Sequence, residues 1–182
     1  EDLRAAGVSG AVLRLRRNVG HQRAIAIGVS FVAERVSSNQ KVVVMDSDGE
    51  DMPHTIADLL DALQDPSVDV VVAQRQRRVE TLRFKLFYAI YKLVFSTLTG
   101  RQINFGNVMA LKASVLKRLA SMQELSVHFA AAVLNSKLRI KHLPLDRGNR
   151  YAGRSKMNFV GLILHGVRGL MVFAEDVTVR VG

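Results

Sequence analysis

The fold of this protein is decided by residues 41–51, which read KVVVMDSDGED. An unbroken apolar run, Val42–Met45, follows Lys41 and ends abruptly at four carboxylates within six residues. A short apolar run bounded in this way is typical of a strand buried in a parallel sheet. Working outward along the chain, Val12–Leu15 and Val68–Ala73 are the other predicted buried strands.

Helical patterns separate these three predicted strands. Apolar residues at helical spacing predict one helix from about Val19 to Val36 and another from about Pro53 to Leu63. Proline suits the first turn of the second helix, because its missing N–H has no intrahelical partner there. The alternation predicts an α/β fold, with a mostly parallel sheet and helices on both faces. Ligands of such sheets bind outside the carboxyl ends of the strands.

Size and composition predict a single domain over residues 1–182. The chain is 48% hydrophobic, which is enough to form one sizeable core, and no Pro/Gly/Ser-rich stretch divides it. The absence of cysteine excludes disulfides, thiolate zinc sites and cysteine nucleophiles. The first ten residues lack the basic and apolar regions of a signal peptide or anchor.

The net charge of +10 is unevenly distributed along the chain. Residues 1–73 carry 7 Lys and Arg against 11 Asp and Glu, whereas residues 74–182 carry 19 against 5. A basic second part of this kind attracts phosphate, on a nucleic acid, an anionic lipid headgroup or a phosphorylated substrate. The alternative is an ordinary solvated basic face.

Two apolar helices are predicted in the basic part, at Phe84–Phe95 and Met157–Ala174. At about 1.5 Å per residue the second would be roughly 27 Å long, just short of a comfortable bilayer span. Its glycines and the internal Arg168 favour a helix that lies in the membrane interface. Residues 157–174 are therefore a candidate membrane-interface helix, with a plain core helix as the alternative.

The carboxylates that follow Val42–Met45 are the most specific chemical feature. Carboxylates crowded at a strand end repel one another, so a cation stabilises them. Asp46 and Asp48 could present oxygens to one Mg²⁺ or Mn²⁺, leaving positions for the oxygens of a diphosphate leaving group. The alternative is a solvated acidic turn in which Asp51 caps the following helix. The five histidines are scattered, no pair has zinc spacing, and we interpret them as hydrogen-bonded or exposed side chains.

The order of several motifs resembles that of family 2 glycosyltransferases, in particular the polyprenyl-phosphate enzymes of the dolichol-phosphate mannose synthase kind. Five segments carry the resemblance and span most of the chain: RNVGHQ at 17–22 with Ala24 and Gly28, VVVMDSDGEDMP at 42–53, the arginines Arg75 and Arg78, Gly106-Asn107, and RYAGRSK at 150–156. The resemblance implies a Rossmann-like GT-A domain that binds a nucleotide sugar.

The resemblance also implies a role for each matching residue. Asp46 and Asp48 would hold the metal, and Asp48, Asn107 and Arg150 would act in catalysis. The donor nucleotide sugar would contact Arg17, Asn18, Gly20 and Asp46. The acceptor phosphate would contact Arg75, Arg78, Arg150, Ser155 and Lys156. If these basic residues converge beside the acidic loop, a phosphate acceptor is favoured over a saccharide.

The sequence departs from the family pattern in three places. The family's opening strand, with its Pro-x-Tyr/Phe-Asn-Glu segment, has no counterpart before Glu1, so the domain is expected to be N-terminally incomplete. Asn107 replaces an acidic residue and Glu50 replaces a glutamine. A phosphate acceptor is already anionic near neutral pH, with a second pKa of about 6, so Asn107 could serve by hydrogen bonding alone.

The predicted function is inverting, metal-dependent transfer of a sugar from a nucleotide sugar to a polyprenyl phosphate at the cytoplasmic face of the cell membrane. A saccharide or another lipid is the alternative acceptor. A basic module that binds nucleic acid or membrane is disfavoured, because such a protein gains nothing from four crowded carboxylates. No RNA-binding motif accompanies the aromatic residues, so no nucleic-acid partner is expected.

Overall fold

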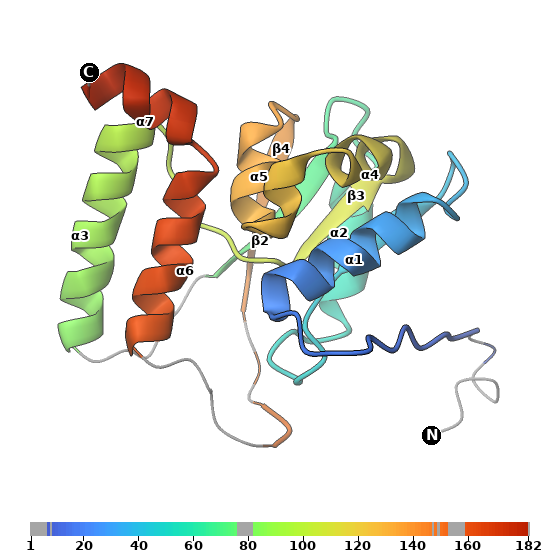
Figure 1. Ribbon diagram of the computed structural model, residues 1–182. Coiled ribbons are helices and arrows are strands. Elements are labelled where there is room, and N and C mark those ends of the chain that lie inside the picture. Colours follow the sequence, from blue (N-terminus) through green and yellow to red (C-terminus); the bar gives the residue numbers. More distant parts are fainter. Residues whose placement is uncertain are drawn as a thin grey trace.

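The computed structural model describes residues 7, 9–75, 82–146, 148, 150–152 and 159–181, without the side chains of 75 and 82–87. Its centre is a four-stranded mixed sheet in the order β1-β3-β2-β4 (Figure 1). β3 runs antiparallel to both its neighbours, and β2 and β4 are parallel, so three strands point the same way. The strands are β1 (Lys41–Val44), β2 (Val70–Arg75), β3 (Met109–Lys112) and β4 (Ile140–Leu145).

Helices cover both faces of this sheet. Alternate residues of a strand point to opposite faces, and both faces carry apolar side chains that the helices bury. Val70 and Val72 pack into a core with three α-helices and a short 3-10 helix, whereas Val71 packs on the other face against Leu59 of α2. The first face is covered by α1 (His21–Ala33), α4 (Ala113–Ala120), η1 (Gln123–Ser126) and α5 (Phe129–Asn135), and the second by α2 (Thr55–Ala62).

Three further helices stand to one side of the sheet (Figure 1). They are α3 (Leu82–Thr99), α6 (Phe159–Met171) and α7 (Ala174–Val181). Phe95 of α3 and Phe173 meet edge to face with ring centres 5.6 Å apart, and both pack on Ala131 of α5. α3 and α6 approach closely, since a methyl group at Gly166 would lie 2.8 Å from the ring of Tyr91. No helix of the described residues is both long and apolar enough to span a bilayer.

The predicted α/β fold with helices on both faces is confirmed, and the strand and helix around the acidic loop lie within a few residues of their predicted bounds. The predicted strand Val12–Leu15 is wrong: it joins no sheet, and Val12 is 93% exposed. Arg14 interrupts this run and Arg16 and Arg17 follow it, so it offers no continuous apolar face to bury. The strands β3 and β4 were not predicted.

The predicted helix Met157–Ala174 is observed as α6, which ends three residues earlier than predicted, and a separate helix, α7, begins at Ala174. α6 ends at Met171, and Ala174 begins α7 after a turn closed by the hydrogen bond from Phe173 N to Leu170 O. Val172 and Phe173 are buried at this turn, so packing against α3 and α5 interrupts the helix. Residues 157 and 158 lie outside the described part of the chain.

Candidate functional site

The candidate site lies at the carboxyl ends of the three strands that point the same way. The loop after β1 and the segment after β4 both lie below the sheet in the view of Figure 1. A small pocket opens here, lined by residues from the loop after β1, the start of α2, the carboxyl-terminal parts of β2 and β4, and the approach to β3. Its lining residues are Asp51, Met52, Thr55, Ala73, Gly106, Val108, Leu145 and Asp146.

The acidic loop of residues 45–52 is shaped by hydrogen bonds within itself. The backbone N–H of Asp46 donates to Asp51 Oδ2 at 3.0 Å, and the N–H of Glu50 donates to Asp48 Oδ1 at 3.1 Å. Asp51 is only 6% exposed, and α2 has no side-chain cap at its own N-cap residue, His54. The carboxylate of Asp51 thus helps to close the acidic loop, and the alternative interpretation of Asp51 as a helix cap stays a prediction.

Gly49 allows the segment after β4 to pack directly on this loop. Its φ of 90° is a conformation that residues with a Cβ rarely adopt, and a Cβ there would lie 2.6 Å from the ring of Tyr151. Two backbone hydrogen bonds join the segments: Tyr151 N donates to Asp48 O and Gly148 N donates to Glu50 O, both at 2.9 Å. The acidic loop is thus held in place by residues about a hundred positions further along the chain.

This packing places Arg150 in contact with the carboxylates of Asp48 and Glu50. Its Nη2 lies 3.1 Å from Asp48 Oδ2, and its Nε donates to Glu50 Oε1 at 2.5 Å. The hydrogen bond to Glu50, supported by the negative charges of Glu50 and Asp48, raises the pKa of Arg150 above its ordinary value. Arg150 is a permanent cation in contact with the loop that is predicted to hold a metal and a diphosphate.

The start of α1 contacts the other side of the acidic loop. Gly20, with a φ of 83°, is the N-cap residue of α1, and its N–H donates to Asn18 Oδ1 at 2.9 Å. The next residue, His21, donates from Nε2 to Asp46 Oδ1 at 3.3 Å. This hydrogen bond raises the pKa of His21, although burial opposes the rise. Asp46 is therefore oriented by the first residue of α1.

Gln22 connects α1 to Asn107, which follows Gly106 of the pocket. The side chain is 6% exposed, and its Nε2 lies 3.5 Å from Asn107 Oδ1, a long hydrogen bond. Its Oε1 accepts from the backbone N–H of Phe129 at 2.6 Å. Successive residues of one helical turn thus contact Asp46 and Asn107.

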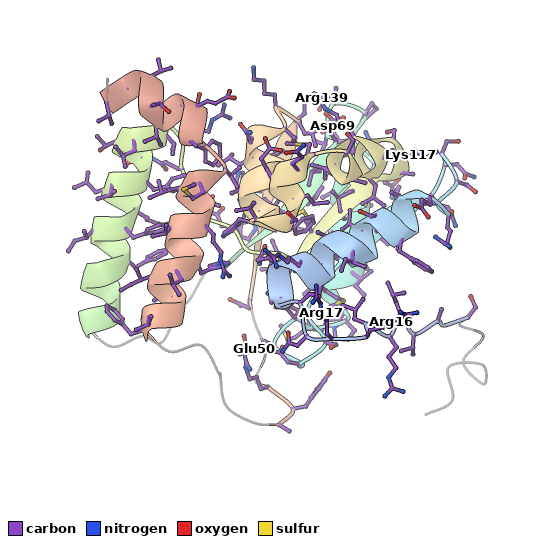
Figure 2. The ribbon with its side chains drawn as sticks, in the orientation of Figure 1. Arg16, Arg17, Glu50, Asp69, Lys117 and Arg139 are labelled. Carbon is purple, nitrogen blue, oxygen red and sulfur yellow. The ribbon has the colours of Figure 1, made fainter. Side chains whose placement is uncertain are left out.

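The predicted acceptor residues are only partly placed. Arg75 ends β2 opposite Leu145 of β4, at the sheet edge where the site lies, but its side chain is not described. Arg78, Ser155 and Lys156 lie outside the described residues. Of the four basic residues expected to converge beside the acidic loop, Arg150 does so. Figure 2 shows Arg17 and Glu50 at the lower edge of the molecule, and Asp69 and Arg139 at the opposite edge.

The carboxylates of Asp46 and Asp48 suit a metal ion whose remaining ligands come from a substrate and water. In the part of the chain that the structure describes, no three His, Cys, Asp or Glu side chains converge as an all-protein metal site. Asp46 and Asp48 nevertheless present oxygen at the end of β1, beside Arg150 and His21. Mg²⁺ is commonly bound by one or two carboxylates, with phosphates and waters as the remaining ligands. These two residues suit that mode of binding.

His21 and Gln22 are site residues that were not predicted. Both belong to the RNVGHQ segment, so a signal was present: polar residues in the first turn of a helix that follows a glycine N-cap. Their partners, Asp46 and Asn107, lie 25 and 85 residues away in sequence. Only the packed structure shows these pairs.

Comparison with known proteins agrees with this geometry. The sequence profile of Glycosyl transferase family 2 matches residues 4–116, more than half of the chain, including the acidic loop and Asn107. No curated protein matches the chain. The matched region has the GT-A Rossmann-like fold, and membership implies a nucleotide-sugar donor and an acceptor. The chain belongs to glycosyl transferase family 2 and is a glycosyltransferase.

Proposed function

We propose that this enzyme is an inverting, metal-dependent glycosyltransferase that transfers a sugar to a polyprenyl phosphate at the cytoplasmic face of the cell membrane. The observation that supports the proposal most is the contact of Arg150 with Asp48 and Glu50. It brings Arg150 to the acidic loop, so donor and acceptor groups can meet at one edge of the sheet.

The donor half of the site consists of the acidic loop and the start of α1. Asp46 and Asp48 would hold Mg²⁺ or Mn²⁺, which neutralises the charge that develops on a departing nucleoside diphosphate. Arg17, Asn18 and the residues around Gly20 precede the N-terminus of a 13-residue helix. Such a terminus attracts phosphate through its partial positive charge. We assign these residues to the nucleotide.

The acceptor half is assigned to Arg150 with Arg75, Arg78, Ser155 and Lys156. Arginine binds phosphate through two parallel N–H groups, and lysine adds a point charge. A phosphate acceptor is already ionised, so Asn107 can assist it without acting as a base. A saccharide acceptor is the alternative, and it would require a group that removes a proton from a hydroxyl.

The membrane part of the proposal is supported by the exposed side chains of α3 and α6. Leu93 of α3 is 67% exposed, and α6 exposes a longer apolar face. Residues 74–182, which contain both helices, also carry 19 Lys and Arg against 5 Asp and Glu. Apolar helices beside basic charge are typical of proteins that lie on anionic membranes. The exposed apolar residues of α6 are Phe159, Val160, Ile163, Leu164, Val167 and Met171.

The function is tested by incubating the protein with a panel of nucleotide sugars and a polyprenyl phosphate, with and without Mn²⁺. We expect a lipid-linked sugar only when the metal is present. A saccharide panel under the same conditions is the control for acceptor class. Transfer to saccharides without transfer to the polyprenyl phosphate would contradict the proposed acceptor.

Membrane binding is tested with vesicles. We expect the protein to sediment with anionic vesicles and less with neutral ones, and salt to weaken the binding, because headgroup attraction is screened over about 8 Å at physiological ionic strength. Leu164→Glu on α6 should reduce sedimentation. Val12→Glu is the matched control, since Val12 is also exposed but lies outside α3 and α6. Equal binding of both variants to all vesicles would contradict the proposal.

A further inference from the structure

The backbone N–H of Phe129 fixes the orientation of an amide in the site. A backbone N–H can only donate, so the atom of Gln22 that lies 2.6 Å from it must be the carbonyl oxygen. The other end of the Gln22 amide is therefore the NH₂ group, which faces Asn107. Because that group can only donate, the atom of Asn107 that faces it is Oδ1, at 3.5 Å.

Because Oδ1 of Asn107 faces Gln22, the NH₂ group of Asn107 is the end of the amide that faces away from Gln22. Asn107 directly follows Gly106, which lines the pocket at the strand ends with Asp51 and Asp146. On the neighbouring position of α1, His21 contacts Asp46, so the acidic loop and Asn107 are held by one helical turn. An aspartate in place of Asn107 would present only acceptors when ionised, whereas the oriented asparagine presents two N–H donors.

We propose that Gln22 is a positioning residue, which holds Asn107 so that its NH₂ group donates to an ionised oxygen of the acceptor phosphate. The inference rests on the proposed function and goes beyond it, because it explains how the site would recognise an acceptor that needs no general base. An N–H donor stabilises a phosphate oxygen and cannot accept the proton of a saccharide hydroxyl as a base would. The orientation of one buried amide thereby selects the acceptor class.

Gln22→Glu tests the orientation with nearly unchanged shape. The ionised carboxylate still accepts from Phe129 N but cannot donate to Asn107. We expect Asn107 to turn its NH₂ group toward the new carboxylate, so that Oδ1 takes the place of the NH₂ group at the other end of the amide. The buried Phe129 N–H and the partly buried Asn107 both keep a hydrogen bond, so the protein should remain folded. We expect kcat/KM for the polyprenyl phosphate to fall about ten- to a hundredfold, the effect of losing a hydrogen bond to a charged group, with donor affinity nearly unchanged.

The pH profile separates this effect from a structural one. In Gln22→Glu, burial disfavours the charged form of the carboxyl group and the N–H donors of Phe129 and Asn107 favour it, so the pH profile itself locates its pKa. Below that pKa the protonated carboxyl can donate to Asn107 Oδ1 as the amide does. The ratio of variant to wild-type kcat/KM should therefore approach one at low pH and fall as pH rises through that pKa. Gln22→Met is the control, since it can neither donate nor accept, and its ratio should stay low without this pH dependence.

An NMR measurement on the wild-type protein tests the proposal even if the variants fail to fold. In nitrogen-15-labelled protein, saturating farnesyl phosphate should shift the side-chain NH₂ signals of Asn107 and the Nε signal of Arg150. A shift at Arg150 without one at Asn107, or a pH-independent ratio near one for Gln22→Glu, would overturn the role of Gln22. Shifts at neither residue, with no transfer to polyprenyl phosphate, would overturn the proposed acceptor and this inference with it.

Discussion

Replacing Asp48 by alanine is expected to lower the rate of sugar transfer by about 10²–10³-fold, the loss typical of removing one group that stabilises developing charge. Asp48 is a proposed metal ligand, and it also contacts Arg150 at 3.1 Å. Its loss should therefore abolish metal-dependent binding of the nucleotide, which calorimetry on the purified protein measures directly.

Asp58→Ala is the matched control for this prediction, because Asp58 is an exposed carboxylate on α2, away from the acidic loop. Its effect on transfer and on nucleotide affinity should be small. A folded Asp48→Ala protein with unchanged metal-dependent affinity would mean that residues 46–51 form only a solvated acidic turn.

Replacing Arg150 by alanine is expected to act selectively on the acceptor. A charge-assisted contact of about 1.5–3 kcal/mol corresponds to about ten- to over a hundredfold in kcat/KM for the polyprenyl phosphate. The affinity for the donor nucleotide, measured by calorimetry, should change much less. Arg150→Lys should recover only part of the loss, because an ammonium group is a point charge and cannot bind a phosphate through two parallel N–H groups as a guanidinium does.

The control for Arg150 is a second arginine–carboxylate pair, whose members directly precede β4 and β2. Arg139 and Asp69 lie at the other edge of the sheet, with Nη2 and Oδ1 2.7 Å apart (Figure 2). The hydrogen bond from Arg139 lowers the pKa of Asp69 to about 2. Arg139→Ala should affect stability slightly and acceptor use hardly at all. An Arg150→Ala protein that loses donor affinity and acceptor use equally would contradict the assignment of Arg150 to the acceptor.

The part of the fold that could be predicted is the part encoded by neighbouring residues. The apolar run Val42–Met45 and the carboxylates after it are contiguous, so strand and loop follow from local pattern alone. The run Val12–Leu15 shows the limit of this reasoning: it is as short as Val42–Met45, but Arg14 interrupts it and the folded core offers it no partner. β3 was missed because four residues with one lysine carry too weak a pattern.

The candidate site was predictable only where a motif identified its residues. Arg150 could be expected near the acidic loop from the order of motifs, and the structure places it there. The roles of His21 and Gln22 depend on side-chain hydrogen bonds to Asp46 and Asn107, which no local pattern encodes. Such pairs arise from the packing of α1 against the strand ends and become visible only in three dimensions.

The hydrogen bonds between the acidic loop and the segment after β4 also have a consequence for folding kinetics. They join residues about a hundred positions apart, such as Glu50 and Gly148. Contacts of such sequence separation carry a high loop-closure entropy and form slowly. We therefore expect the catalytic constellation to assemble late in folding. Recovery of transferase activity reports completion of the whole domain, whereas recovery of helical signal reports only its earlier steps.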